Sequence, residues 1–397
     1  MKEPPDRPQR GADRRELAPL PEPESSASVR PRSDRGRGSS NPRPLVVRFG
    51  AMGDMVMLTA LTRLLARRFG APCDVVASQG SPQLVFRELD SIGDVFTVQS
   101  RRRPFWFSLE QQELVRQLRR RGPSPTFVLD DLPKVHWLLR RADIPERLIV
   151  RPSPTGASDG LEPRGDLEHL VDFAARLGRC GEFGPSRCFV GEPSPRAELA
   201  TSQAERNDCA RWLAGRGLAG RQLVLLQPLS RRRRRGRWPI ENWRRLALAI
   251  TDRLPEARLL LTGSPEEAPL LAELERSIAV PAVRSVAPDL PLRRLFALLE
   301  VAHSCVSIDT GPAQAAAALG CPLVVLFGRA DPRRNAPRGD GPIAVCCAWP
   351  RERWPATRRE WEGSHAMAEI SPQSVIDAWT EVTSGEVAVT ARPGAAL

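Results

Sequence analysis

The segment 306–328 constrains the fold most, because it contains a strand, a tight turn, a helix of small residues and a second strand in one short stretch. This succession predicts a βαβ unit of a parallel sheet. Pro312 suits the first helical position, and Gly311 lets the turn tighten and a ligand approach the backbone. The backbone N–H groups of Ala313 and Gln314 would then point outwards. The segment predicts a phosphate site, with a plain crossover as the alternative.

Similar alternation runs along most of the chain and predicts parallel sheets covered by helices on both faces. Proline and glycine increase at 185–195, where we place a linker. Before it we predict strands at 45–49, 74–77 and 126–129, and helices at 55–69, 110–120 and 166–177. After it we predict strands at 223–226, 258–261, 305–308 and 323–327, and helices at 204–215, 240–252, 265–277, 292–302 and 313–319.

The fold expected from this pattern is α/β, with two doubly wound, Rossmann-like domains facing a central cleft. We predict an N-terminal domain at 44–190, a C-terminal domain at 196–370 and a closing helix at 371–382. The chain of 397 residues is too long for one ordinary core, and 41% hydrophobic residues are enough for two. We predict a disordered tail at 1–43, rich in Pro and Arg, and a flexible tail at 383–397.

Neither a membrane span nor a secretory signal is expected. No apolar run reaches the roughly 18 residues that a span needs, and the N-terminus is polar and proline-rich. We therefore predict a cytoplasmic protein. The eight cysteines lack a repeated Cys-x-x-Cys spacing, which indicates reduced core residues and no disulfide framework.

The formal net charge of +12 raises nucleic acid as a partner. Nearly all the cations are arginine and tyrosine is absent, a bias typical of a GC-rich genome. No DNA-binding motif is present, and no aromatic residues interleave with the basic ones as a stacking platform requires. We predict no nucleic-acid partner; the positive charge favours an anionic one.

Four blocks of sequence, in order from about 44 to 380, resemble glycosyltransferase family 9, the bacterial lipopolysaccharide heptosyltransferases. The blocks are 44–65, 225–246, 259–267 and 309–334. A closing segment at 364–379 is also similar. The resemblance implies the GT-B architecture of two facing Rossmann-like domains and an inverting enzyme. It would move heptose from ADP-heptose to a lipid-linked saccharide, the lipopolysaccharide core, with peripheral contact at the inner face of the inner membrane.

The resemblance places the family's catalytic aspartate on Asp54, which would take the proton from the acceptor hydroxyl. Asp54 follows a glycine-bounded turn at the end of a predicted strand. Its alternative role is that of a helix N-cap, for which aspartate is well suited.

The donor is expected to bind to the C-terminal domain. Thr310 and the backbone after Gly311 and Pro312 would hold phosphate oxygens, and Asp309 would brace the turn or the sugar. By resemblance, Glu266 or Glu267, after the Gly263 turn, would accept from ribose hydroxyls. Either glutamate could equally serve as a first-turn acid that complements the helix dipole. The predicted donor-binding residues are Asp309, Thr310, Gly311, Pro312, Gln314, Arg235, Arg237, Glu266, Glu267 and Gly263.

Three positions depart from the family pattern. Gln314 stands where the family usually has histidine, and glutamine cannot carry charge. Gly236 stands where a lysine is common, so that Arg235 or Arg237 would have to hold the diphosphate in its place. Ala366 replaces a cysteine of many members, which makes a cysteine cluster improbable. The rest of the arginine run at 231–235 fits a solvated loop.

We expect a glycosyltransferase that needs no metal and no cofactor. No Asp-x-Asp motif stands in a turn that faces the cleft. Asp130 and Asp131 have neither the spacing nor the neighbouring ligand residues of a metal site. Two alternatives remain: a transferase of the same fold with another nucleotide sugar, and a non-catalytic basic binding protein.

Overall fold

The computed structural model describes residues 42–98, 108–130, 132–151, 169–179, 196–230, 237–350, 353–355, 360–361 and 367–384. The tails predicted at 1–43 and 383–397 lie almost wholly outside these ranges. The predicted linker at 185–195, together with Arg235, Gly236 and Ala366, also lies outside them.

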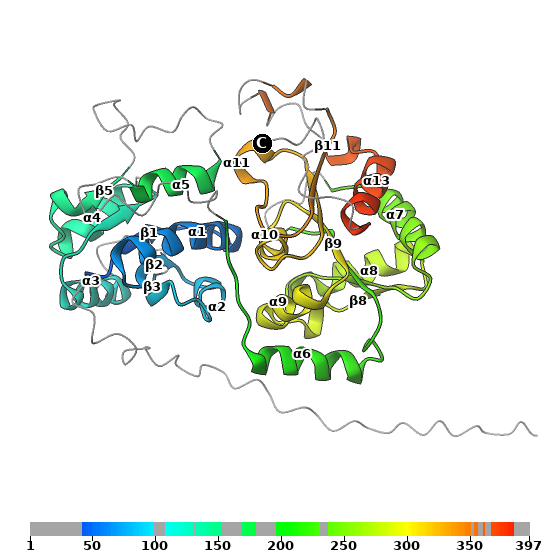
Figure 1. Cartoon of the computed structure of the whole chain (residues 1–397), viewed down its shortest axis with the longest axis horizontal. Coiled ribbons are helices and arrows are strands. Elements are labelled where there is room, and N and C mark those ends of the chain that lie inside the picture. The colour runs from blue at the N-terminus through cyan, green and yellow to red at the C-terminus, as the bar shows by residue number, and fades with distance from the viewer. Residues whose placement is uncertain are drawn as a thin grey trace, which may run out of the picture. The chain divides into compact units, whose positions relative to one another are not determined.

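The first sheet is parallel, with strand order β3-β2-β1-β4-β5. Its strands are β1 (Leu45–Arg48), β2 (Cys73–Ser78), β3 (Ile92–Val98), β4 (Thr126–Val128) and β5 (Ile149–Val150). Figure 1 shows these strands with their helices in blue to green. All of them fall within the predicted N-terminal domain.

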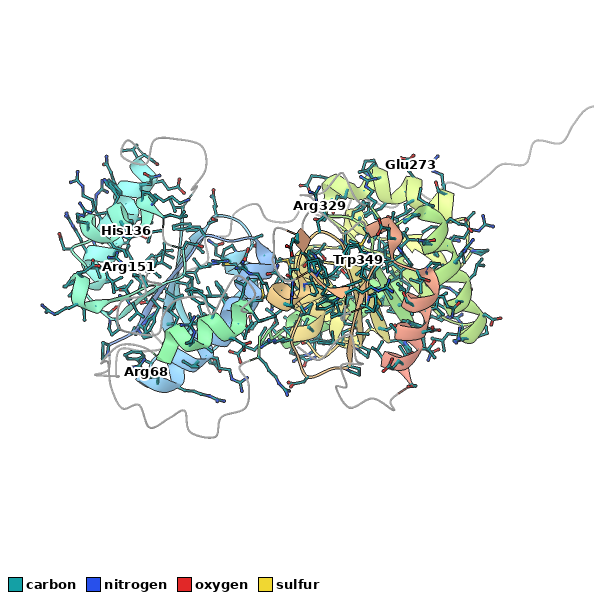
Figure 2. All side chains as sticks on the ribbon, turned by 90° about the horizontal axis from the view of Figure 1, so that it is seen from above. Arg68, His136, Arg151, Glu273, Arg329 and Trp349 are labelled. Atoms are coloured by element: carbon teal, nitrogen blue, oxygen red, sulfur yellow. The ribbon has the colours of Figure 1, made fainter. Side chains whose placement is uncertain are left out.

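Alternation along the strands gives this sheet two apolar faces. Leu45 and Val47 of β1 belong to one cluster, with α3 (Leu109–Arg121) and α4 (Pro133–Arg141). Val46 belongs to another. That second face is covered by α1 (Met52–Phe69), α2 (Pro82–Val85) and α5 (Leu170–Arg179). At the edge strand β5, Arg151 contacts the Nδ1 atom of His136 at 2.8 Å, a pair labelled in Figure 2.

The second sheet is also parallel, with order β11-β10-β9-β6-β7-β8. Its strands are β6 (Leu223–Gln227), β7 (Arg258–Leu261), β8 (Val283–Ser285), β9 (Ser304–Ile308), β10 (Leu323–Phe327) and β11 (Ile343–Cys347). One face packs on α7 (Ile240–Arg253), α8 (Ala268–Ile278) and α13 (Pro372–Thr383). The other packs on α9 (Leu292–Val301) and α10 (Gly311–Ala318), with α6 (Gln203–Gly215) against α9. The predicted class, two parallel-sheet α/β domains, is confirmed.

Several short elements escaped the sequence-based prediction. Strands β3, β5, β8 and β11 and helices α2 and α4 were not expected. Strand β5 has two residues and β8 three, too few to show a period. The helix expected at 265–277 divides into a 3-10 turn (Pro265–Glu267) and α8, because Pro269 stands at the start of α8.

One apolar cluster is continuous between the two sheets. It runs from Val46 and Val75 of the first sheet through the buried face of α1, and on to the alanines of α10 and Val325 of the second sheet. Helices α1 and α10 contact each other directly. The helices in the described ranges include none that is long and apolar enough to cross a membrane.

Candidate active site

Each sheet has one point where the strand order reverses direction, and in open α/β sheets ligands bind there, outside the carboxyl ends of the strands. In the first sheet the reversal lies between β1 and β4. The segments that leave these two strands contain Asp54 and Asp130. In the second sheet it lies between β6 and β9, and the segment after β9 contains Asp309 and Thr310. Most of the predicted site residues therefore lie at the two reversals.

Asp54 is the third residue of α1, which begins three residues earlier than predicted, at Met52. The N-cap is Ala51, whose side chain cannot cap, so Asp54 is not itself the N-cap. Its Oδ2 atom instead accepts from the backbone N–H of Ala51 at 2.7 Å. Its Oδ1 atom accepts from Arg48 at 2.9 Å. The side chain is 21% exposed, so a ligand can still reach the carboxylate.

Arg48 lies between two carboxylates. One guanidinium nitrogen donates to Asp54 and the other donates to Asp130 Oδ1 at 2.7 Å. Asp130 also accepts from the backbone N–H of Phe49 through its Oδ2 atom. Burial lowers the pKa of Arg48, but the charges of Asp130 and Asp54 and their hydrogen bonds outweigh burial and raise it. The guanidinium therefore stays charged, and it joins the ends of β1 and β4.

A pocket opens beside Arg48 and Asp54, and its remaining lining is apolar. The lining residues are Arg48, Asp54, Met57, Leu58, Leu129, Leu170, Phe173 and Ala174. They come from β1, α1, the end of β4 and α5. Asp54 thus faces a hollow of its own domain, where an acceptor group can approach it.

The start of α10 has part of the geometry expected of an anion site. Pro312 has no N–H, and the N–H groups of Gly311 and Ala313 are in the first turn, where no intrahelical acceptor exists. The N–H of Gln314, expected to be free, donates to Thr310 O at 3.3 Å. The Thr310 hydroxyl lies 3.1 Å from Ser307 Oγ and donates to Ile308 O at 3.1 Å, so it is held in one position.

The two turns that the sequence singles out meet in space. A Cβ atom added to Gly53 would lie 3.5 Å from Gly311 Cα and 3.3 Å from Gln314 Cγ. A Cβ atom added to Gly311 would lie 3.0 Å from Met52 Cβ and Sδ. Two glycines thus let the first turn of α1 pack against the first turn of α10. Asp54 is one residue from this contact.

Gln314 is buried at 4% exposure, and its Nε2 atom donates to Asn335 O at 2.6 Å. This bond ties α10 to the short helix α11 (Pro332–Asn335). The amide thus has a structural partner at the position where the family usually has histidine.

The acidic candidates after β7 lie one strand further along the sheet. Glu267 is half-buried and accepts from Ser264 N at 2.9 Å, which caps the 3-10 turn, whereas Glu266 is exposed. A Cβ atom on Gly263 would lie 3.1 Å from Glu267 Oε2. Asp309 is half-buried, and its N–H donates to Leu326 O at 3.1 Å.

Of the two arginine candidates for the diphosphate, the structure describes only Arg237, which is exposed. The next residue, Trp238, is buried, donates to Ile370 O at 2.9 Å and packs edge-on against Trp243. The buried Trp238 therefore anchors the start of α7, and Arg237 lies just before this anchor. In the described part of the chain, no three His, Cys, Asp or Glu side chains gather as a metal site.

Sequence reasoning missed Arg48 and Asp130 as members of the site. Asp130 was considered only as a metal ligand. Its position directly after a strand was the available signal, because the carboxyl ends of neighbouring parallel strands meet at one sheet edge.

Residues 190–360 match the family model of glycosyltransferase family 9 (heptosyltransferase). The resemblance to this family is confirmed. The family 9 match covers the second sheet and the segments with Arg237, Gly263 and Thr310. Lipopolysaccharide heptosyltransferase 1 of Escherichia coli is 25% identical over 323 residues, which cover 78% of this chain and 94% of that protein. These relatives indicate a glycosyltransferase.

Solved structures of heptosyltransferases share the fold. The E. coli ADP-heptose lipopolysaccharide heptosyltransferase II has a TM-score of 0.64 at 20% identity and covers 86% of this chain and 98% of its own. A family 9 glycosyltransferase of Veillonella parvula has a TM-score of 0.68 at 16% identity, with coverage of 86% and 97%. An E. coli heptosyltransferase with ADP has a TM-score of 0.59 at 21% identity, with coverage of 85% and 99%. The two domains therefore have the GT-B architecture.

Proposed function

We propose that this family 9 glycosyltransferase moves a heptose from ADP-heptose to the core saccharide of lipopolysaccharide. The observation that carries the proposal is the contact of the first turn of α1, which contains Asp54, with the first turn of α10, a helix start suited to phosphate. The relatives support the donor and acceptor: one is a lipopolysaccharide heptosyltransferase, and others were solved with ADP or with ADP-2-deoxy-2-fluoro heptose.

The proposed reaction is a single displacement with inversion. The acceptor oxygen attacks the anomeric carbon while the bond from that carbon to the diphosphate breaks and ADP leaves. The acceptor proton passes to Asp54, whose carboxylate is held by Ala51 N and Arg48 and lies at the pocket described above.

Negative charge develops on the departing diphosphate. The N–H groups of Gly311 and Ala313 and the positive end of α10 would stabilise it, with Pro312 fixing the helix start. The Thr310 hydroxyl would join them by exchanging its bond to Ile308 O for one to a phosphate oxygen. Asp309 would brace this turn from the end of β9.

Further donor contacts are assigned by resemblance. Glu266 or Glu267, after Gly263, would accept from the ribose. Arg235 or Arg237 would hold the diphosphate, and their joint replacement by alanine should raise the donor concentration needed for half-maximal rate. Gln314 would contribute by fixing α10, since its amide already donates to Asn335 O.

The donor class is tested by thermal shift with ADP, ADP-heptose, UDP and GDP, followed by a transfer assay. A selective shift with ADP and ADP-heptose supports the proposal, since a ligand at 100 times its dissociation constant adds about 2.7 kcal/mol. A selective shift with UDP or GDP would indicate another nucleotide sugar. Binding to DNA with a steep salt dependence and no transfer would indicate a basic binding protein.

We further propose that transfer needs no metal and takes place at the inner face of the inner membrane, where the lipid-linked acceptor is reached. Activity that survives EDTA, and association with anionic vesicles that weakens with salt, would support these two points. Loss of activity on chelation with recovery on adding a divalent ion would contradict the first.

A further inference from the structure

Arg48 bonds both to the proposed catalytic carboxylate and to Asp130. The Arg48 side chain is 19% exposed, and the Asp130 side chain 15%. Asp130 does not line the pocket beside Asp54, whereas Arg48 does. The contact that connects Asp130 to the pocket is its bond to Arg48.

A single arginine beside a general base presents a chemical difficulty. An adjacent guanidinium favours the ionised form of a carboxylate and so weakens it as a proton acceptor. Here the same guanidinium also donates to Asp130 at 2.7 Å, compared with 2.9 Å to Asp54. The Asp130 carboxylate therefore partly neutralises the positive charge of Arg48. With both acids ionised, Arg48, Asp54 and Asp130 together carry one net negative charge.

We propose that Asp130 is a positioning residue that acts through Arg48 on Asp54. This inference rests on the proposed function, in which Asp54 is the base. Arg48 fixes the Oδ1 atom of Asp54, while Ala51 N fixes Oδ2, so that the carboxylate keeps one orientation at the pocket. Asp130 fixes Arg48 in turn and offsets its charge next to Asp54.

The other elements packed around Asp54 bring little charge. From α4, the Lys134 ammonium lies over the Phe49 ring, 4.8 Å from its centroid. Helix α5 lines the pocket with apolar side chains, and its Arg176 guanidinium lies over the ring of the lining residue Phe173, 5.6 Å from the centroid. Asp172 of α5 pairs with Arg338, and His169, just before α5, contacts Ala336 O.

Helix α10 contributes uncharged residues at its contact with α1. Among the described residues, Arg48 is therefore the charged side chain bonded to Asp54, and Asp130 is the acid bonded to Arg48.

The experiment compares the pH dependence of kcat in Asp130→Asn and Arg48→Gln. Asp130→Asn leaves the guanidinium to Asp54 alone, so kcat should fall and its acid limb should move to lower pH by about one unit. Arg48→Gln removes the cation, so the acid limb should move to higher pH. Donor KM should stay unchanged in both, because neither residue lies on the donor domain.

A double-mutant cycle separates positioning from a general loss of structure. In the Asp54→Asn background, Asp130→Asn should cause no further loss of kcat, because its effect acts through the carboxylate that is already gone. Asp94→Asn is the matched control: Asp94 of β3 pairs with Arg43 at 3.3 Å at the opposite edge of the same sheet, where the strands begin, and its replacement should leave the profile unchanged.

Two results overturn the inference. The first is that the acid limbs of the kcat profiles of Asp130→Asn and Arg48→Gln do not move in opposite directions. The second is that Asp130→Asn lowers kcat in the Asp54→Asn background as much as it does in the wild type. Wild-type activity of Asp54→Asn is a different failure, because it removes the base itself and with it the proposed mechanism.

Discussion

Protonation of His169 should destabilise the protein below neutral pH. His169 precedes α5, is 3% exposed, and uses both ring nitrogens: Nε2 contacts Ala336 O at 2.8 Å, and Val171 N donates to Nδ1 at 3.2 Å. Nδ1 must therefore be unprotonated and Nε2–H the donor. Burial first, then the nearby Arg338, lowers the pKa of His169 from 6.5 to about 4.

The size and pH range of the effect follow from these values. Above pH 6.5 the imidazole is neutral in both folded and unfolded chains, so the folded protein has its full stability. Below pH 6.5 the unfolded chain binds the proton and the folded chain does not, so stability falls until about pH 4. A difference of about 2.5 pKa units gives a loss of about 3 kcal/mol at the limit and about 2 kcal/mol at pH 5.

The assay is urea unfolding of the wild type and His169→Gln at pH 8 and pH 5. Any other group that binds protons between these pH values is common to both proteins, so the difference between the two isolates His169. The wild type should lose about 2 kcal/mol more than the variant between these pH values. An equal loss in both would show that His169 is not held neutral, and would refute the reasoning.

Three further outcomes are expected. Asp54→Asn should lower the transfer rate by roughly 10²- to 10⁴-fold with donor affinity nearly intact, whereas activity within a few-fold of wild type would leave Asp54 only its bond to the start of α1. Gly311→Val should weaken ADP binding in titration calorimetry, and Met52→Ala should not restore it; full restoration would mean that the glycine serves packing alone. Asp74→Asn should lower the free energy of unfolding by about 3 kcal/mol, because the carboxylate is 1% exposed and pairs with two arginines; a change below about 1 kcal/mol would contradict this.

Sequence periodicity predicted the long, regular elements well, because their apolar residues repeat over several turns or strand residues. Strands β7 and β10 have the predicted bounds. Strand β3, with the sequence IGDVFTV, was missed: it lies at the sheet edge and most of its side chains are only half-buried, so it lacks the apolar run of a central strand.

The sequence indicated backbone turns of the candidate site but not the partners of its side chains. The glycines at 53 and 311 marked turns that do lie at strand ends and contact each other's helices. The partner of the Gln314 amide, Asn335 O, depends on how α11 folds back onto α10, and no local pattern encodes that approach. The same holds for Arg48, whose two carboxylates come from positions 6 and 82 residues away.

The apolar cluster shared by α1 and α10 bears on how this chain reaches its native state. A truncation after the first sheet would leave the α10-facing side of α1 in water, and the complementary fragment would expose the alanines of α10. Each fragment expressed alone should aggregate through this exposed apolar surface. When the two fragments are mixed, they should associate and form a soluble complex. Hydrogen exchange in the strands of both sheets should then report a single global opening, since neither sheet can lose its packing without uncovering that of the other.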